Sequence, residues 1–218
     1  MTPDGQFWWN WWIQFGVATG TFAVALVALF GEALRSKLFP PLLSLQLLRP
    51  EGERTRIKIT TPPAEGSTHR KEDARVYHVH VVNERRWSPA HQVQVFLMRL
   101  EEPGPDGELA VTWVGDLPIR WRNQEVFPLA RTIGPSADCD LCTVIKDKCV
   151  EIHPLVVPFN LEIRRSGKVV MVASLQARGN QANSEVLRVH ISWDGGWEAG
   201  DQEMKRHLVV KALSETSV

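Results

Sequence analysis

The sequence predicts an all-β domain that follows one N-terminal transmembrane helix. Residues 11–30 contain no Asp, Glu, Lys, Arg or His. After residue 41, apolar and polar residues alternate in many short segments, and turn-forming residues separate these segments. Alternation at period two is typical of half-buried antiparallel strands, of which we expect about eight to ten. The preferred architecture is an immunoglobulin-like antiparallel β-sandwich, and a barrel is the second choice.

The N-terminal segment has the length and composition of a membrane span. At about 1.5 Å per helical residue, residues 11–30 extend roughly 30 Å, which matches the hydrocarbon thickness of a bilayer. Tryptophans gather at its N-terminal end, where lipid headgroups favour indole rings: Trp8, Trp9, Trp11 and Trp12. A cleaved signal peptide is an alternative, but no Lys or Arg precedes the run and no small-residue cleavage site follows it. A buried helix of a soluble protein is the other alternative, but the run lacks a polar face.

The charges that flank the span predict its orientation. Asp4 is the only charged side chain before it, whereas Arg35 and Lys37 follow it. Because basic residues stay on the cytoplasmic side, we expect an external N-terminus and a cytoplasmic C-terminal domain at the inner (plasma) membrane of a bacterium-like cell. Two prolines end the helix, so residues 1–38 form the short external N-terminus and the span, and residues 39–218 form the cytosolic β-sandwich domain. Further basic residues able to hold the domain on anionic lipid, or to form a solvated strand face, are Arg49, Arg54, Arg56 and Lys58.

Two glycines stand one helical turn apart within the span. Gly16 and Gly20 form a G-x-x-x-G pair, and glycines at this spacing let a second helix approach closely. The pair therefore predicts helix–helix packing and a homo-oligomer formed through the span. Small residues are common in transmembrane helices, so a span without a helical partner is the alternative.

The strand segments follow in chain order. Alternating patterns occur in residues 42–48, 54–60, 75–82, 91–100, 168–177, 185–193 and 206–213. Gly104-Pro105-Asp106-Gly107 and Asp194-Gly195-Gly196 have the composition of turns between strands. Residues 62–73 are polar and contain Pro and Gly, which predicts an exposed loop.

All three cysteines of the chain stand near a histidine in the sequence. The spacing C-x2-C-x6-C-x3-H joins Cys139, Cys142, Cys149 and His153. Three thiols and an imidazole can close a tetrahedral zinc site, so a structural zinc is one hypothesis. The preferred interpretation is reduced, unligated cysteines that pack as small hydrophobes, with no cofactor. A disulfide is disfavoured by a cytoplasmic location and becomes more plausible if the orientation is reversed.

A loop between two strand segments is the best candidate for recognition. It combines an aromatic side chain with basic ones: Arg85, Arg86, Trp87 and His91. The alternative is an Asn-initiated turn with Trp87 folded over the sandwich edge. His78 and His80 share one strand face and form a second metal hypothesis, with exposed or packed histidines as its alternative.

Composition and motifs exclude several classes of function. Lys+Arg and Asp+Glu both number 25, so the formal net charge is zero and gives no reason to expect a nucleic-acid partner. No P-loop, dinucleotide fingerprint, nucleophile elbow or paired-carboxylate pattern is present, so we expect no enzyme. The sequence favours an interaction or scaffold module that acts as an accessory subunit of a membrane-associated complex, with the bilayer and a protein at the membrane as partners. The alternatives are a membrane effector, whose sensor domain assembles the spans and perturbs the bilayer, and a zinc-dependent protein.

Overall fold

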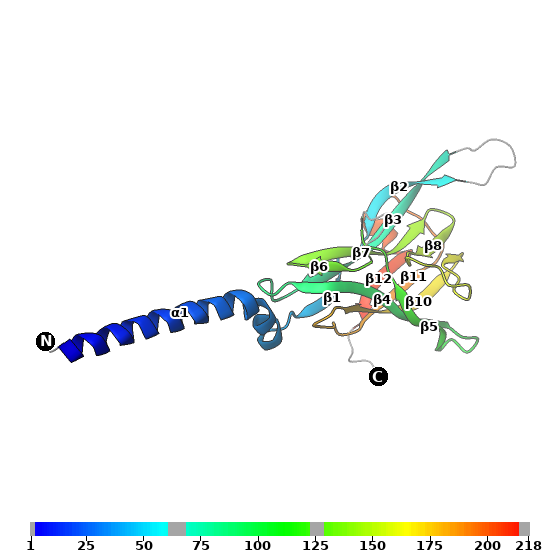
Figure 1. Ribbon diagram of the computed structural model, residues 1–218. Helices are drawn as coiled ribbons and strands as arrows, with labels where there is room; N and C mark the ends of the chain where they lie inside the picture. Colours follow the sequence, from blue (N-terminus) through cyan, green and yellow to red (C-terminus); the bar gives the residue numbers. More distant parts are fainter. Residues whose placement is uncertain (1–2, 61–68, 123–128, 214–218) are drawn as a thin grey trace. The chain divides into compact units, whose positions relative to one another are not determined.

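A computed structural model describes residues 3–60, 69–122 and 129–213 of the chain. The chain divides into two compact units, Met1–Pro40 and Pro41–Val218. The first unit contains the helix α1 (Pro3–Leu38), and the second unit, which we call the β-domain, consists mostly of β-strands (Figure 1). The prediction of an apolar N-terminal helix followed by antiparallel β-structure is confirmed.

The helix α1 contains one segment, Trp8–Ala28, that is long and apolar enough to cross a membrane. The side chains of this segment are all exposed. Trp11 stacks on Phe15 with ring centroids 5.4 Å apart, and the neighbouring tryptophans meet Trp11 edge to face. Thr21 donates a hydrogen bond of 2.8 Å to the Val17 carbonyl, so this hydroxyl is satisfied within the helix.

In the described part of the β-domain, the strands form two six-stranded antiparallel sheets. The first sheet has the order β1-β3-β7-β8-β9, and β2 also pairs with β3. Its strands are β1 (Leu43–Leu47), β2 (Glu53–Thr60), β3 (His69–Asn83), β7 (Ser136–Ile145), β8 (Cys149–Ile152) and β9 (Arg164–Ser166). Successive side chains of a strand point to opposite faces, so the alternation in the sequence determines which face is buried. On β3, the side chains of Tyr77, Val79 and Val81 all point into the core.

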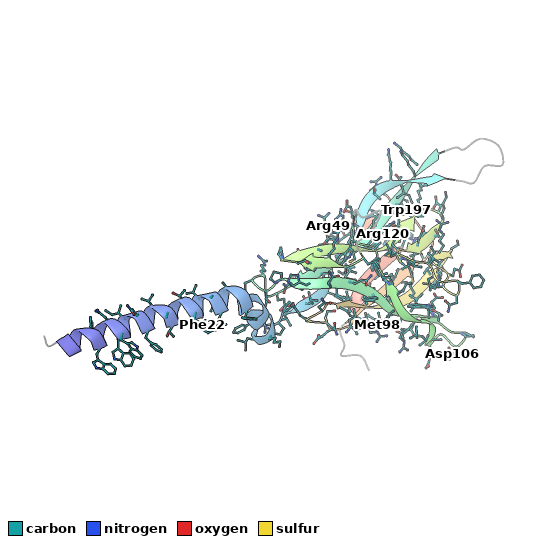
Figure 2. The ribbon with its side chains drawn as sticks, viewed as in Figure 1. Phe22, Arg49, Met98, Asp106, Arg120 and Trp197 are labelled. Atoms are coloured by element: carbon teal, nitrogen blue, oxygen red, sulfur yellow. The ribbon has the colours of Figure 1, made fainter. Side chains whose placement is uncertain are left out.

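The second sheet has the order β12-β11-β10-β4-β5, and β6 also pairs with β4. Its strands are β4 (Ala90–Pro103), β5 (Leu109–Pro118), β6 (Arg131–Ile133), β10 (Val169–Arg178), β11 (Leu187–Trp193) and β12 (Leu208–Leu213). A short helix, α2 (Asp201–Met204), precedes β12. The predicted turn between β4 and β5 is present, and Asp106 lies at the tip of this hairpin (Figure 2).

Both sheets contribute their inner faces to one hydrophobic core. Its largest fully buried apolar side chains include Trp121, Trp193, Tyr77, Leu97, Met171 and Ile191. The indole of Trp193 donates a hydrogen bond of 2.7 Å to the Gly196 carbonyl, so its polar group is satisfied at the edge of the core. The two sheets therefore enclose a sandwich-like core.

A buried arginine ties the C-terminal segment to the first sheet. Arg75 on β3 is only 1% exposed. Its guanidinium donates hydrogen bonds to the Asp201 carboxylate (2.7 Å) and to the Glu51 carbonyl (3.0 Å), and it lies over the ring of Trp197. A buried charge needs such partners, so the segment around α2 is held against β3.

One predicted loop is partly wrong. Residues 69–73 belong to β3 and pair with β2, whereas residues 62–68 lie outside the described residues. The outer part of the β2–β3 hairpin projects from the sandwich (Figure 1), so this part lacks a core to face and is mostly polar, whereas β3 from Tyr77 onward lies in the sandwich. Cross-strand ion pairs take the place of apolar contacts, as between Arg56 and Asp73 at 3.3 Å. A polar sequence therefore marks an exposed hairpin here and not only a loop.

Candidate functional site

Three short segments that are far apart in the sequence lie side by side in the first sheet. They share a polar–apolar–polar pattern: His78-Val79-His80 on β3, Asp138-Cys139-Asp140 on β7, and Arg120-Trp121-Arg122 next to β7. Cys139 is the register partner of Val79 on one side and forms a bridge with Trp121 on the other. Because side chains alternate across a strand, the three central residues are buried and the six polar residues share the outer face. We call these six residues the His–Asp–Arg face.

The first row of this face runs from β3 across β7. His80 Nδ1 lies 2.6 Å from Asp138 Oδ1, and Arg122 Nη1 lies 3.7 Å from Asp138 Oδ2. Glu53 on β2 connects this row to the next one. Its Oε2 atom lies 2.6 Å from Arg122 Nη2 and 3.7 Å from His78 Nε2.

The second row repeats the arrangement in a more buried setting. His78 Nδ1 lies 3.0 Å from Asp140 Oδ1, and Arg120 Nε lies 3.6 Å from Asp140 Oδ2. Burial acts to raise the pKa of Asp140, but His78 and Arg120 outweigh burial and lower that pKa below its usual value. Next to this row, His153 Nε2 lies 2.6 Å from Thr143 Oγ1, and burial together with Arg120 lowers the pKa of His153.

The His–Asp–Arg face presents fixed charges on a sheet surface. Its two arginines and two aspartates sum to zero formal charge when the histidines are neutral. The network includes first-row pairs that are partly exposed and contribute about 0–1 kcal/mol each to stability, whereas its His78–Asp140 pair is largely buried. The network holds six polar side chains in a defined pattern, and patterned charges select a partner of complementary pattern and speed its association.

The predicted recognition loop lies in the turn between β3 and β4. The backbone N–H of Arg85 donates to Asn83 Oδ1 (3.2 Å), and that of Ser88 donates to the Arg85 carbonyl (2.8 Å), so an asparagine does initiate the turn. Trp87 is 48% exposed and Arg86 is also exposed. The fourth predicted residue, His91, lies on β4, where its Nδ1 atom is 3.3 Å from Thr132 Oγ1.

The four residues of the zinc hypothesis lie on both sides of the first sheet. Cys139 and Cys142 are free thiols on the core side of β7, and Cys149 is a buried free thiol on β8. The ring of His153 is on the outer side of the sheet, where its Nε2 atom forms a hydrogen bond with Thr143 Oγ1. Among residues 3–60, 69–122 and 129–213, no group of three or more His, Cys, Asp or Glu side chains is arranged to hold a metal. The sequence spacing is therefore not accompanied by a shared site.

The predicted membrane residues all belong to the first unit. The side chains of the four tryptophans and of Lys37 are exposed, whereas the side chain of Arg35 lies outside the part that the structure describes. A Cβ atom added at Gly16 or Gly20 would meet nothing within 4 Å, so this helix face is open. Phe22 projects from α1 in the same exposed manner (Figure 2).

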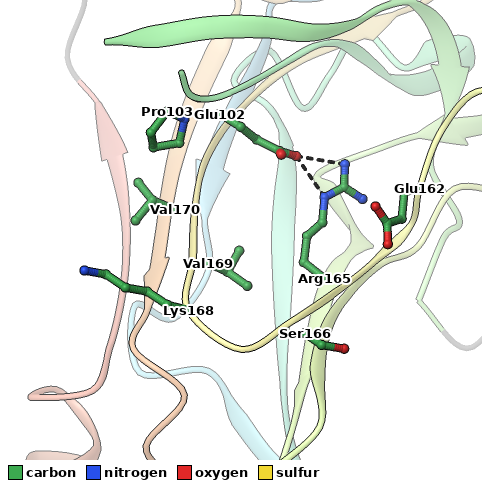
Figure 3. A pocket seen from close by; sticks show the side chains of 8 residues that line it. All are labelled: Glu102, Pro103, Glu162, Arg165, Ser166, Lys168, Val169 and Val170. Carbon is green, nitrogen blue, oxygen red and sulfur yellow. Dashed lines mark hydrogen bonds and ion pairs between the residues drawn. The ribbon is translucent and has the colours of Figure 1, made fainter. Parts of the chain in front are cut away.

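A cleft of about 570 Å³ lies between the end of β4, residues 162–168 and the start of β10 (Figure 3). Arg165 Nε and Nη2 both lie 2.8 Å from Glu102 Oε1, which fixes this guanidinium at the wall. The cleft is lined by two acids, Glu102 and Glu162, and two bases, Arg165 and Lys168. These charges balance, so the cleft does not favour a ligand of either sign.

A second cleft of about 720 Å³ lies beside β1 and has both apolar and polar walls. Its wall combines leucines of β1 with Val186, Leu187 and Leu213 from the region of β11 and β12. Two exposed acids, Glu84 and Glu185, stand at its margin. Neither cleft is lined by a residue of the His–Asp–Arg face.

Only part of the His–Asp–Arg face is predicted from the sequence. The spacing of His78 and His80 places them on one strand face, but it does not connect them with Asp138, Asp140 or the two arginines. The repeated polar–apolar–polar triplet is the signal that could have found them. The buried Arg75 carries no such signal, because a charged residue in an alternating strand is normally placed on the exposed face.

Comparisons of the chain with protein-family models, with curated proteins and with solved structures find no match. The function is therefore inferred from the residues and geometry of this chain alone.

Proposed function

We propose that the chain is a single-pass membrane protein whose β-domain is a non-enzymatic interaction or scaffold module, acting as an accessory subunit of a membrane-associated complex. The observation that carries this proposal is the segment Trp8–Ala28, which has no charged residue and exposes its side chains all round the helix. In water, such a helix leaves a large apolar surface uncovered, whereas a bilayer covers that surface and accepts a fully hydrogen-bonded helix backbone.

The proposed orientation is N-terminus outside and β-domain in the cytoplasm, at the inner membrane. It is supported by the flanking charges, with Asp4 before the span and Arg35 and Lys37 after it. Three free cysteines in the β-domain agree with a reducing compartment. We further assign the sandwich to the immunoglobulin-like class, on the basis of its strand spacing and its two antiparallel sheets around one core.

The His–Asp–Arg face is the proposed partner surface. Its charges are held by neighbours at 2.6–3.7 Å, so their positions are fixed before a partner arrives. Preorganised side chains lose less conformational entropy on binding than mobile ones do. The partner should be a membrane-bound protein with a complementary arrangement of acidic and basic side chains.

The membrane proposal is tested by extraction and by topology. The full chain should stay in the membrane pellet through a carbonate wash and dissolve only in detergent. A reporter fused after Val218 should be active in the cytoplasm. Release by carbonate would contradict the span, and a reporter that works only in the periplasm would reverse the orientation.

The partner proposal is tested by co-purification from detergent-solubilised membranes. Asp138→Asn should remove a co-purifying membrane protein that the wild-type chain retains. The matched control is Asp116→Asn, because Asp116 also pairs with an arginine (Arg178, 2.9 Å) but belongs to the second sheet. The same set of co-purified proteins from wild type and both variants would contradict the assignment of this face.

A further inference from the structure

We propose that the β3–β4 turn, residues 84–88, docks on the surface of the bilayer. The indole of Trp87 then lies in the headgroup region, and the guanidinium of Arg86 lies against lipid phosphate. This inference rests on the proposed function, because it requires α1 to span the membrane. It adds to that function a second contact with lipid, made by the β-domain itself.

The connection between the helix and the turn is short. Leu42 follows Leu38, the last residue of α1, by only four positions, and four residues extend at most about 14 Å. The backbone of Leu42 forms hydrogen bonds with Asn83 and Glu84 at the start of the turn. Its carbonyl accepts a hydrogen bond from the backbone N–H of Glu84 (2.9 Å), and its N–H donates to Asn83 Oδ1 (3.3 Å). Chain length therefore keeps this turn within reach of the C-terminal end of α1, which continues ten residues beyond the apolar segment Trp8–Ala28.

The turn is anchored to the β-domain by a buried asparagine. Asn83 is fully buried at 0% exposure. Its amide group donates to the Ser88 carbonyl (2.8 Å), and its carbonyl oxygen accepts from the N–H groups of Arg85 and Leu42 (3.2 and 3.3 Å). One buried side chain therefore fastens both ends of the turn to the point where the chain enters the β-domain, so the turn cannot swing away from it.

The exposed side chains at the turn have the chemistry of a membrane-interface contact. Trp87 is 48% exposed and Leu42 is 46% exposed, so two apolar groups stand on this surface. Tryptophan is enriched at membrane interfaces, and arginine pairs with lipid phosphates there. Glu84 opposes this attraction, but Arg85 and Arg86 leave the turn with one net positive charge.

Two basic residues of β2 lie far from this turn along the sheet. Arg54 and Lys58 on β2 pair with Arg75 and Lys71 on β3, which precede Asn83 by 8 and 12 positions. At about 3.3 Å per residue, these partners stand roughly 26 and 40 Å along β3 from its end. Such distances exceed the Debye length of about 8 Å at physiological salt, so the two regions act independently.

The test places an environment-sensitive fluorophore next to the turn in the full-length chain. Pro89→Cys keeps Trp87 and Arg86 intact and offers an exposed thiol, whereas the three native cysteines are buried. The matched control is Asp106→Cys at the far end of β4, about 45 Å away along that strand. Both proteins are labelled with NBD and reconstituted into vesicles of phosphatidylcholine, with or without one quarter phosphatidylglycerol.

The expected result is strong quenching at position 89 by lipids that carry a nitroxide at the headgroup, at least threefold more than at position 106. Trp87→Ser on the Pro89→Cys background should lower this quenching at least twofold. Arg86→Gln should remove its increase with phosphatidylglycerol. These two variants change exposed side chains, so the fold is retained.

The alternative outcomes separate the two proposals. Flotation of the carbonate-washed protein with the vesicles, combined with equal quenching at both positions, would overturn the docking proposal and leave the membrane span intact. Failure to float would overturn the span and the docking proposal together. Self-quenching of the label at position 89 without quenching by lipid would mean that the turn meets a second copy of the chain, which also overturns docking on lipid.

Discussion

Replacing Asn83 with alanine should destabilise the β-domain by about 3 kcal/mol. The side chain is completely buried and takes part in four hydrogen bonds. Its oxygen accepts from Leu42 and Arg85, and its nitrogen donates to Ser88 at 2.8 Å and to Ile133 at 3.4 Å. Two of these bonds have lengths in the usual range and contribute about 1 kcal/mol each, and the two longer bonds contribute about 0.5 kcal/mol each, so their combined loss sets the magnitude.

The assay is urea unfolding of the full chain in detergent, followed by tryptophan fluorescence and circular dichroism. With an m-value of about 2 kcal/mol/M, the midpoint of Asn83→Ala should fall by about 1.5 M. The matched control is Asn180→Ala, an exposed asparagine that should change the unfolding free energy by less than about 0.5 kcal/mol. If the two variants unfold at the same urea concentration, the assigned role of the Asn83 amide is wrong.

Three further predictions concern buried groups and backbone conformation. Burial raises the pKa of the Cys142 thiol to about 12, so a maleimide at pH 7.5 should modify it only after denaturation; rapid native labelling would contradict its buried position. The pKa of His153 is lowered, mainly by burial, so as the pH falls the imidazole becomes protonated in the unfolded state before it does in the folded state. The unfolding free energy should therefore fall as the pH drops below about 6.5, and His153→Gln should reduce that fall. Gly52 has φ +72°, and a Cβ atom there would lie 2.7 Å from the Tyr77 ring, so Gly52→Ala should cost about 2 kcal/mol or more in thermal unfolding. Gly107→Ala, with φ +84° and open space, should cost about 1 kcal/mol, and equal costs would show that the ring contact is unimportant.

The sequence was informative wherever a local pattern determines structure. The charge-free run predicted the apolar helix, because length and composition alone decide whether a helix can cross a bilayer. The alternation around Tyr77 and Val79 predicted a strand with one buried face, because the pleat places every second side chain on the same side. The turn at Asp106 followed from its Gly-Pro-Asp-Gly composition.

The candidate site could not be predicted in the same way, because it depends on pairing between distant segments. His78 meets Asp140 only because β3 pairs with β7 in one register, and a bulge after Tyr77 shifts that register. Arg120 reaches the same row through backbone hydrogen bonds with Asp140 and His153. Since a shift of one residue would turn these side chains into the core, the pattern of one strand cannot reveal its neighbours.

The strand order also determines when the chain can finish folding. Each sheet joins strands from both halves of the sequence: β3 pairs with β7, and β4 pairs with β10. The ladder between Glu101 and Val172 connects residues 71 positions apart, which a ribosome takes about 4–14 s to synthesise. During this interval one edge of β4 has no partner strand, and unpaired edges promote aggregation. Truncation before Val169 would make that state permanent, so the final quarter of the chain is required to close the second sheet.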